Sequence, residues 1–193
     1  MTLVSPAEKT EEQLVQEVLQ GRKNSFAPLM QGNWPKVHSV VRRIFGEEHA
    51  DDICQEAFLR AFHKLEQFDC SRPFFPWVMK IATNLCSEQA RRGGKLFSLQ
   101  SLDDLSLETP GPGPGEVVFS QWLWNEFLGS LPVAYRVLFA LRHGLGLSYE
   151  EMAWILDEPL GTVKTSLFRA REMLRRRCTR DGALVVNEKG ESS

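Results

Sequence analysis

The stretch over residues 147–177 constrains the fold most, because two helices and a tight turn can be read from it. Ser148, followed three residues later by Glu151, forms a capping box, which predicts that a helix begins there. Asp157 falls where the turn needs a left-handed backbone, which Asp tolerates better than most residues other than glycine. Pro159 suits the first position of a second helix, because its missing N–H would be unpaired there.

The second of these helices has an apolar side and a basic side. Its apolar residues recur at helical spacing: Val163, Leu167, Ala170 and Leu174. Residues 160–181 contain seven Lys or Arg and two Asp or Glu. This arrangement predicts a helix-turn-helix, whose second helix is shaped to enter the major groove of DNA. The alternative is an ordinary helical hairpin with a solvated basic face, since most charge runs are simply solvated.

The chain as a whole is not basic, so any DNA binding must depend on local patches. Its 193 residues are 42% hydrophobic and 25% charged, with a formal net charge of −2. This composition is ordinary for a globular protein, and the length allows one domain or two. Because the rest of the surface does not attract phosphate, we expect a protein that needs help to hold DNA.

The sequence favours a soluble cytoplasmic protein with no metal and no cofactor. The four cysteines show no C-x-x-C spacing and form no zinc pattern with the histidines, so we expect reduced, mostly buried thiols. These cysteines are Cys54, Cys70, Cys86 and Cys178. The N-terminus lacks the features of a signal peptide, and no apolar run approaches the roughly 18 residues of a membrane span. We therefore expect no membrane insertion.

Four helical segments are expected in the first half of the chain. They cover residues 11–19, a region that opens at Ser25 and ends at Gly46, residues 47–68, and residues 74 to about 92. Gly32 and Pro35 are expected to bend or interrupt the second segment.

The fourth segment has a polar face that suits nucleic acid. An amide and two cations share this face with a serine: Lys80, Asn84, Ser87 and Arg91. Phe75 and Trp77, near the start of the segment, could stack on unpaired bases. For Trp77 the alternative of a core residue stays open, because aromatic residues on helices more often serve packing.

A Pro/Gly-rich stretch separates these segments from the rest of the chain. Alternating Pro and Gly over residues 110–115 fits neither helix nor sheet, so residues 94–116 are expected to form a flexible linker. The second domain should contain helices over residues 117–130 and 133–141 before the helix-turn-helix. We therefore expect an all-α protein with two helical domains, residues 10–93 and 117–178, and disordered tails over residues 1–9 and 179–193.

These segments together resemble a known family. DDICQEAFLRAFHKLEQFD (residues 51–69) and FFPWVMKIATNLCSEQARR (residues 74–92) resemble region 2 of bacterial sigma factors of the sigma-70 family. LPVAYRVLFALRHGLGLSYEEMAWILDEPLGTVKTSLFRAREMLRR (residues 131–176) resembles their region 4. The chain lacks room for regions 1.1 and 3, which is the arrangement of the extracytoplasmic-function (ECF) group. The resemblance covers about residues 10–178.

The resemblance implies a transcription initiation factor with no enzyme activity, which binds core RNA polymerase and directs it to promoters. Polymerase binding would fall to Asp52, Gln55 and Glu56. Minus-ten recognition would fall to Trp77, Lys80, Asn84, Ser87 and Arg91. Minus-thirty-five recognition would fall to Lys164, Thr165, Phe168 and Arg169, with Arg171 and Arg175 placed towards phosphates. Ser166 stands where many members have Arg, which would remove one DNA-binding cation.

Further partners and rival functions follow from the same comparison. The resemblance implies an anti-sigma protein that covers the polymerase-binding faces, and a free chain that is monomeric. The alternative function is a stand-alone helix-turn-helix transcriptional regulator, which would bind a palindrome as a dimer without polymerase. A nuclease or other enzyme would need clustered carboxylates or a His/Cys constellation, and none is apparent in the sequence.

Overall fold

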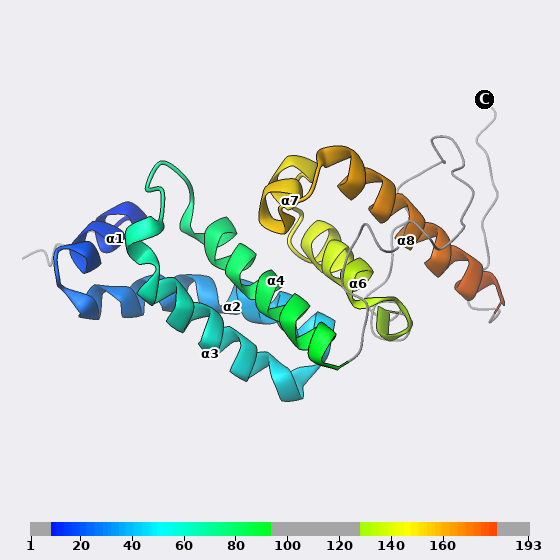
Figure 1. The fold of residues 1–193 in the computed structure, drawn as a ribbon, viewed down its shortest axis with the longest axis horizontal. Helices are drawn as coiled ribbons and strands as arrows, with labels where there is room; N and C mark the ends of the chain where they lie inside the picture. Colours follow the sequence, from blue (N-terminus) through cyan, green and yellow to red (C-terminus); the bar gives the residue numbers. More distant parts are fainter. Residues whose placement is uncertain (1–8, 94–127, 181–193) are drawn as a thin grey trace, which may run out of the picture.

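The computed structural model describes residues 9–93 and 128–180, which are helical with no strand among them (Figure 1). This confirms the expected all-α fold. The expected linker over residues 94–116, most of the helix expected over residues 117–130, and most of both tails lie outside the described residues. No helix within the described parts of the chain has the length and apolar character to cross a membrane.

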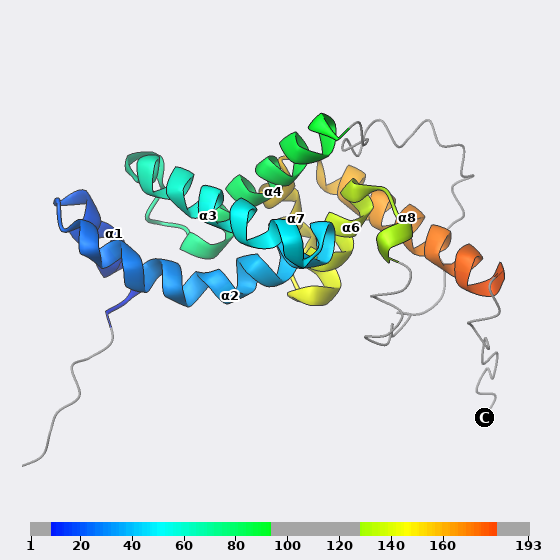
Figure 2. The same cartoon turned by 90° about the horizontal axis from the view of Figure 1, so that it is seen from below.

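The first group of helices, called the N-terminal group, is built around one core. It contains α1 (Glu11–Leu19), α2 (Phe26–Phe45), α3 (Glu47–His63) and α4 (Phe74–Arg92), with short 3₁₀ turns η1 (Lys23–Ser25) and η2 (Leu65–Gln67). Helices α2, α3 and α4 pack against one another (Figures 1 and 2). Val40 of α2, Ala57 of α3 and Val78 of α4 are fully buried between them.

Two boundaries in this group differ from those expected. Helix α2 is continuous through Gly32 and Pro35, so of the expected bend or interruption the interruption is wrong. Both residues are exposed, and buried Leu29 and Val37 on either side hold the helix to the core despite the backbone donor that proline lacks. Helix α3 ends at His63 rather than continuing to residue 68, because the chain tightens into η2.

The second group, called the C-terminal group, contains the helix-turn-helix. It consists of η4 (Leu128–Ser130), α6 (Val133–Phe139), the π-helical turn η5 (Ala140–Gly144), α7 (Tyr149–Leu156) and α8 (Leu160–Arg180). The helix expected over residues 133–141 is present, but its end widens into η5. Helix α8 extends two residues into the stretch expected to be a tail.

The predicted start and turn of the helix-turn-helix are confirmed. The Ser148 hydroxyl accepts a hydrogen bond from the N–H of Glu151 at 3.1 Å, and the N–H of Ser148 donates to Glu151 Oε2 at 2.7 Å. Asp157 ends α7 with φ 57° and ψ 39°, in the left-handed region. Pro159 lies one residue before α8 rather than at its first position, since its carbonyl accepts the N–H of Val163 at 3.1 Å.

The two groups pack against each other. Helix α7 contacts α4, while α6 and η5 contact α2 (Figure 1). These contacts were not expected from the sequence, because a Pro/Gly-rich stretch lies between the two groups. They place the helix-turn-helix beside the helix expected to contact the minus-ten element.

Candidate polymerase and nucleic-acid interfaces

The polar face of α4 is only partly open to solvent. Asn84 and Arg91 are exposed, whereas Lys80 and Ser87 are half-buried. The hydroxyl of Ser87 donates to the carbonyl of Thr83 at 3.0 Å, one turn back in the same helix. The Ser87 hydroxyl therefore donates within α4, and its oxygen can still accept a hydrogen bond from a ligand.

Trp77 lies at the edge of the core, between the two roles that the sequence allowed, a core residue and a surface for base stacking. Its ring centroid is 5.0 Å from that of Phe68 and 5.7 Å from that of Phe74. The side chain is half-buried, so part of the ring is covered by this aromatic cluster and part remains accessible. Phe75, the other proposed stacking residue, has Lys36 Nζ 5.5 Å from its ring centroid.

Lys80 is engaged by the C-terminal group. Its Nζ atom lies 3.0 Å from Asp157 Oδ1 and 5.6 Å from the centroid of the Trp154 ring. Arg72, just before α4, places its guanidinium carbon 5.3 Å from the same ring. Two cations at the start of the proposed minus-ten face thus meet one tryptophan from α7.

The residues expected to contact the minus-thirty-five element lie along α8. Lys164 and Arg175 are exposed, and the other four are half-buried: Thr165, Phe168, Arg169 and Arg171. Lys164 Nζ lies 5.7 Å from the ring centroid of Tyr149, at the start of α7.

An internal ion-pair cluster sits near the end of α8. Glu172 Oε2 accepts from Arg175 Nε at 2.9 Å, and Oε1 accepts from Arg176 Nε at 2.9 Å. The hydrogen bond from Arg175 is the main reason that the pKa of Glu172 is lowered to about 2. The cluster neutralises one of these arginines and fixes both side chains near the helix surface.

Ser166 faces the core rather than DNA. It is 1% exposed and lies on the inner side of α8 with Val163, Leu167 and Ala170, which are also buried. An arginine at this position would have to enter the packed interior of the C-terminal group. Ser166 therefore offers no side chain to DNA in this structure, and its effect on promoter recognition stays a prediction.

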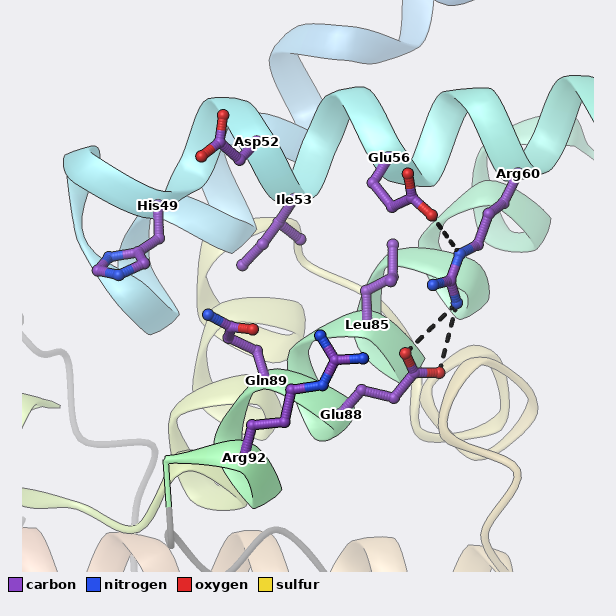
Figure 3. Close-up of a pocket in the computed structure, with 9 residues that line it drawn as sticks. All are labelled: His49, Asp52, Ile53, Glu56, Arg60, Leu85, Glu88, Gln89 and Arg92. Atoms are coloured by element: carbon purple, nitrogen blue, oxygen red, sulfur yellow. Dashed lines mark hydrogen bonds and ion pairs between the residues drawn. The ribbon is translucent and has the colours of Figure 1, made fainter.

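The three residues expected to bind polymerase divide between the two flanks of α3. Asp52 and Glu56 line a cleft of about 350 Å³ between α3 and α4, shown in Figure 3. Gln55 lies on the other flank of α3, in a shallow apolar pocket that Trp34 and Leu59 also line. The Leu59 side chain is 52% exposed. A partner that touches all three residues must therefore lie across the outer ridge of α3.

Arg60 links this face to α4. Its Nε atom donates to Glu56 Oε1 at 2.7 Å, and its Nη1 atom donates to the Glu88 carboxylate at 3.3 and 3.4 Å (Figure 3). The hydrogen bond to Glu56 is the main cause that raises the pKa of Arg60. Sequence reasoning missed this bridge, although Glu56 and Arg60 stand four residues apart, a spacing that favours helical ion pairs.

Arg136 is a second residue whose long-range contacts sequence reasoning missed. It donates to the carbonyls of Leu131 at 2.9 Å, Ile44 at 3.1 Å and Gly129 at 2.6 Å. The Ile44 carbonyl is at the end of α2, so Arg136 ties the two groups together. Burial lowers the pKa of Arg136. The sequence does contain a sign of this buried role, because Arg136 is the single cation within the apolar run VAYRVLFAL.

Two of the cysteine thiols lie in the core. Cys54 and Cys86 are fully buried and unpaired, as expected from the sequence, and Cys70 is half-buried. Burial raises the pKa of Cys54 to about 12 and also raises that of Cys86. Burial thus disfavours the thiolate of both residues, which is the form that acts as a nucleophile.

Comparisons with known protein families match both groups. Residues 29–96 match the family model "Sigma-70 region 2", and residues 123–174 match "Sigma-70, region 4". The ECF RNA polymerase sigma factor SigW of Bacillus subtilis is 33% identical over 174 residues, covering 84% of this chain and 93% of SigW. The ECF RNA polymerase sigma-E factor of Escherichia coli K12 is 32% identical over 176 residues, covering 86% of this chain and 92% of that protein.

Solved structures share the fold. CnrH, in complex with the cytosolic domain of CnrY, aligns with a TM-score of 0.64 at 23% identity over 89% of this chain and 98% of that chain. The sigma factor RpoE of Bartonella quintana, in complex with the anti-sigma factor NepR, aligns with a TM-score of 0.60 at 23% identity over 81% of this chain and 98% of that chain. Family models match both helical groups, and relatives above 30% identity align with this chain over nearly their full length. This chain therefore belongs to the sigma-70 family, as an ECF sigma factor that directs promoter-specific transcription.

Proposed function

We propose that three helices divide the work of this sigma factor: α3 docks on core RNA polymerase, α4 reads the minus-ten element and α8 reads the minus-thirty-five element. The observation that carries this division is the placement of two nucleic-acid-suited faces, on α4 and α8, in different helical groups. Residues 10–93 and 117–178 would then act as two modules, and residues 94–116 as the linker between them.

Helix α8 suits duplex DNA. Thr165 and Phe168 lie opposite the buried stripe of α8, and exposed Lys164 and half-buried Arg169 lie on the two flanks of that side, where a major groove would meet them. Arg169 is proposed to contact a base, because Arg can form two hydrogen bonds with guanine. Arg171 and Arg175, nearer the end of α8, are proposed to contact phosphates, which position the helix without reading sequence.

Helix α4 suits a strand whose bases are unpaired. Exposed Asn84 can hydrogen-bond the edge of a base, and the accessible part of Trp77 offers a surface for stacking. Capture of an unstacked base near Asn84 would offset an unpairing cost of a few kcal/mol, roughly. Strand opening would therefore be helped by binding, while phosphodiester synthesis would belong to the polymerase and this chain would carry out no chemistry.

The outer ridge of α3 suits a basic partner. Asp52 and Gln55 are exposed, and Glu56 is half-buried, which gives the ridge acidic and amide groups that complement a cationic helix. We propose that this partner is core polymerase and that an anti-sigma protein competes for the same ridge, since RpoE of Bartonella quintana shares the fold and is in complex with the anti-sigma factor NepR. The chain would work in the cytoplasm, where RNA polymerase meets the chromosome.

Transcription in vitro tests the proposal most directly. Purified core enzyme and the chain, incubated with a pool of promoter fragments, should give transcripts that core enzyme alone does not give. The free chain should be a monomer and should bind intact duplex poorly. Failure to bind core polymerase, together with tight unaided binding to an intact palindromic operator, would instead support the stand-alone regulator.

Asn84→Ala tests the role of α4. The variant should lose open-complex formation while keeping its affinity for core polymerase, because it removes a base contact and not the α3 ridge. Permanganate footprinting reports the unpaired thymines, and Gln89→Ala is the matched control, since Gln89 is an exposed amide of α4 that lines the cleft towards α3. A footprint that survives Asn84→Ala unchanged would rule out this role for Asn84.

A further inference from the structure

One acidic side chain stands beside the proposed minus-ten face of α4. Glu88 follows Asn84 by four residues, so it lies one turn later on nearly the same side of the helix. A DNA strand carries a negative charge on each phosphate, and a carboxylate next to that strand repels it. Helix α4 therefore places an anion beside the surface where its proposed ligand is also anionic.

The structure directs this carboxylate into the cleft between α3 and α4 (Figure 3). Arg60 of α3 donates from Nη1 to both oxygens of Glu88, at 3.3 and 3.4 Å. The Glu88 side chain is 36% exposed, and its charge is compensated by a cation from another helix. Arg60 therefore both neutralises Glu88 and fixes the direction in which it points.

Arg60 is itself held in place by its own helix. Its Nε atom donates to Glu56 Oε1 at 2.7 Å, one turn earlier in α3, which leaves Nη1 to reach across to α4. Buried Ile53 and Leu85 line the cleft between the two helices, so the bridge to Glu88 passes over apolar side chains. The three charged side chains form one connected group, and Arg60 is its centre.

We propose that Arg60 is a positioning residue for binding of the minus-ten strand. It holds the Glu88 carboxylate in the cleft between α3 and α4, away from the phosphates of a strand bound at Asn84, and does not touch DNA itself. The inference rests on the proposed function, because that function assigns α4 to the minus-ten strand. It adds that α3, the helix proposed to dock on polymerase, also sets the charge beside the DNA face of α4.

Two substitutions separate the proposed role from a merely structural one. Arg60→Met removes the charge and keeps an aliphatic stem with good helix propensity. Glu88→Gln keeps the shape of Glu88 and removes the charge that Arg60 is proposed to restrain. Arg92→Met is the matched control, because Arg92 lines the same cleft and no ion pair joins it to Glu88 within the described residues (Figure 3).

The measurement uses holoenzyme, formed from the full-length chain and core polymerase, and a fluorescent promoter duplex from the transcription pool with a mismatched, already open minus-ten region. Arg60→Met should lower the affinity for this duplex about threefold, and the double variant with Glu88→Gln should regain it. Glu88→Gln alone should stay within about twofold of the unaltered holoenzyme, because Arg60 already restrains that side chain. Glu88→Gln should not restore any affinity that Arg92→Met loses.

Two further readouts accompany the affinities. The loss in Arg60→Met should shrink as the salt concentration rises, because salt screens the repulsion between the carboxylate and the phosphates. Affinity for core polymerase should not fall, because Glu56 keeps its place on the α3 ridge. Thermal unfolding should show that each variant remains folded.

Three results would overturn the proposal. Unchanged affinity of Arg60→Met for the open duplex would show that Glu88 needs no restraint. A loss that Glu88→Gln does not restore, or that salt does not reduce, would show that Arg60 is structural only. Equal rescue of Arg92→Met would show a general effect of charge. Failure of the proposed function is a separate result, because it would appear as absent promoter-dependent transcription by the unaltered chain with core polymerase.

Discussion

The two helices proposed to read DNA, α4 and α8, differ in where their cations find counter-charges. In α8, Arg175 and Arg176 are paired with Glu172 of the same helix. In α4, Lys80 is paired with Asp157, which belongs to the other helical group. The cations of α8 therefore keep their partner when the groups separate, whereas Lys80 loses its partner.

This difference teaches how each helix is prepared for its ligand. Phosphate contacts supply much of the affinity for duplex DNA, so the pairs with Glu172 lower the positive charge that Arg175 and Arg176 offer to it. In α4 the counter-charge of Lys80 comes from the other helical group, so its availability to a strand depends on how the two groups are arranged. The following changes would break or sharpen this comparison.

Replacement of Arg136 should have the largest effect on stability, because Arg136 joins the two helical groups. Their contact also brings Asp157 to Lys80 of α4. Arg136→Leu leaves three carbonyls without their charged donor and should lower the free energy of unfolding by about 2–3 kcal/mol. Arg42→Leu is the control, since the Arg42–Glu47 ion pair is largely exposed and contributes about 0–1 kcal/mol. Urea denaturation measures both, and equal losses would mean that Arg136 is not an anchor.

Arg169→Ala should affect only the element that α8 reads. If Arg169 contacts a base, the loss at the minus-thirty-five element is about 1–3 kcal/mol and depends on the sequence of that element. Holoenzyme affinity for a set of promoters with altered upstream elements measures this dependence. An equal loss on every promoter would assign Arg169 to a phosphate.

Glu172→Gln should make the stability of α8 depend less on pH. The folded pKa of Glu172 is lowered from 4.5 to about 2, so its stabilising effect is complete above pH 4.5 and is lost as pH falls towards 2. At neutral pH the variant should be less stable by roughly 1–2 kcal/mol, with solvent screening considered. The difference should vanish near pH 2 in unfolding curves, and a constant difference would contradict the assignment.

The Lys80–Asp157 pair should have the smallest effect on stability. A double-mutant cycle with Lys80→Met and Asp157→Asn should give a coupling energy of about 0–1 kcal/mol, because Asp157 is largely exposed. The coupling should weaken at high salt, as expected of an exposed ion pair. A coupling that salt leaves unchanged would point to a contact that does not open readily.

Features that depend on neighbouring residues were predictable from the sequence. The capping box of Ser148 and Glu151 and the left-handed Asp157 are local rules, and the structure follows them. The end of α3 was not predictable in the same way, because η2 forms where buried Leu65 and Phe68 meet the core. Helix α2 likewise passes through Pro35 because its two halves pack on one core.

Features that join distant parts of the chain were not predictable. Lys80 and Asp157 are 77 residues apart, and nothing in either segment indicates that they meet. Ser166 is a case in which the family pattern and the structure differ. The pattern suggested a DNA contact at this position, whereas the helical periodicity of α8 places the side chain in the core. The roles of the individual site residues stay predictions until the variants above are measured.

The left-handed backbone at Asp157 has an evolutionary consequence. Few side chains suit that conformation, yet Asp and Asn both do, so the position can exchange one for the other while the fold stays intact. Such an exchange would remove the negative charge that faces Lys80 and would leave the turn between α7 and α8 as it is. The charge beside α4 can therefore change without a change in the shape of the helix-turn-helix.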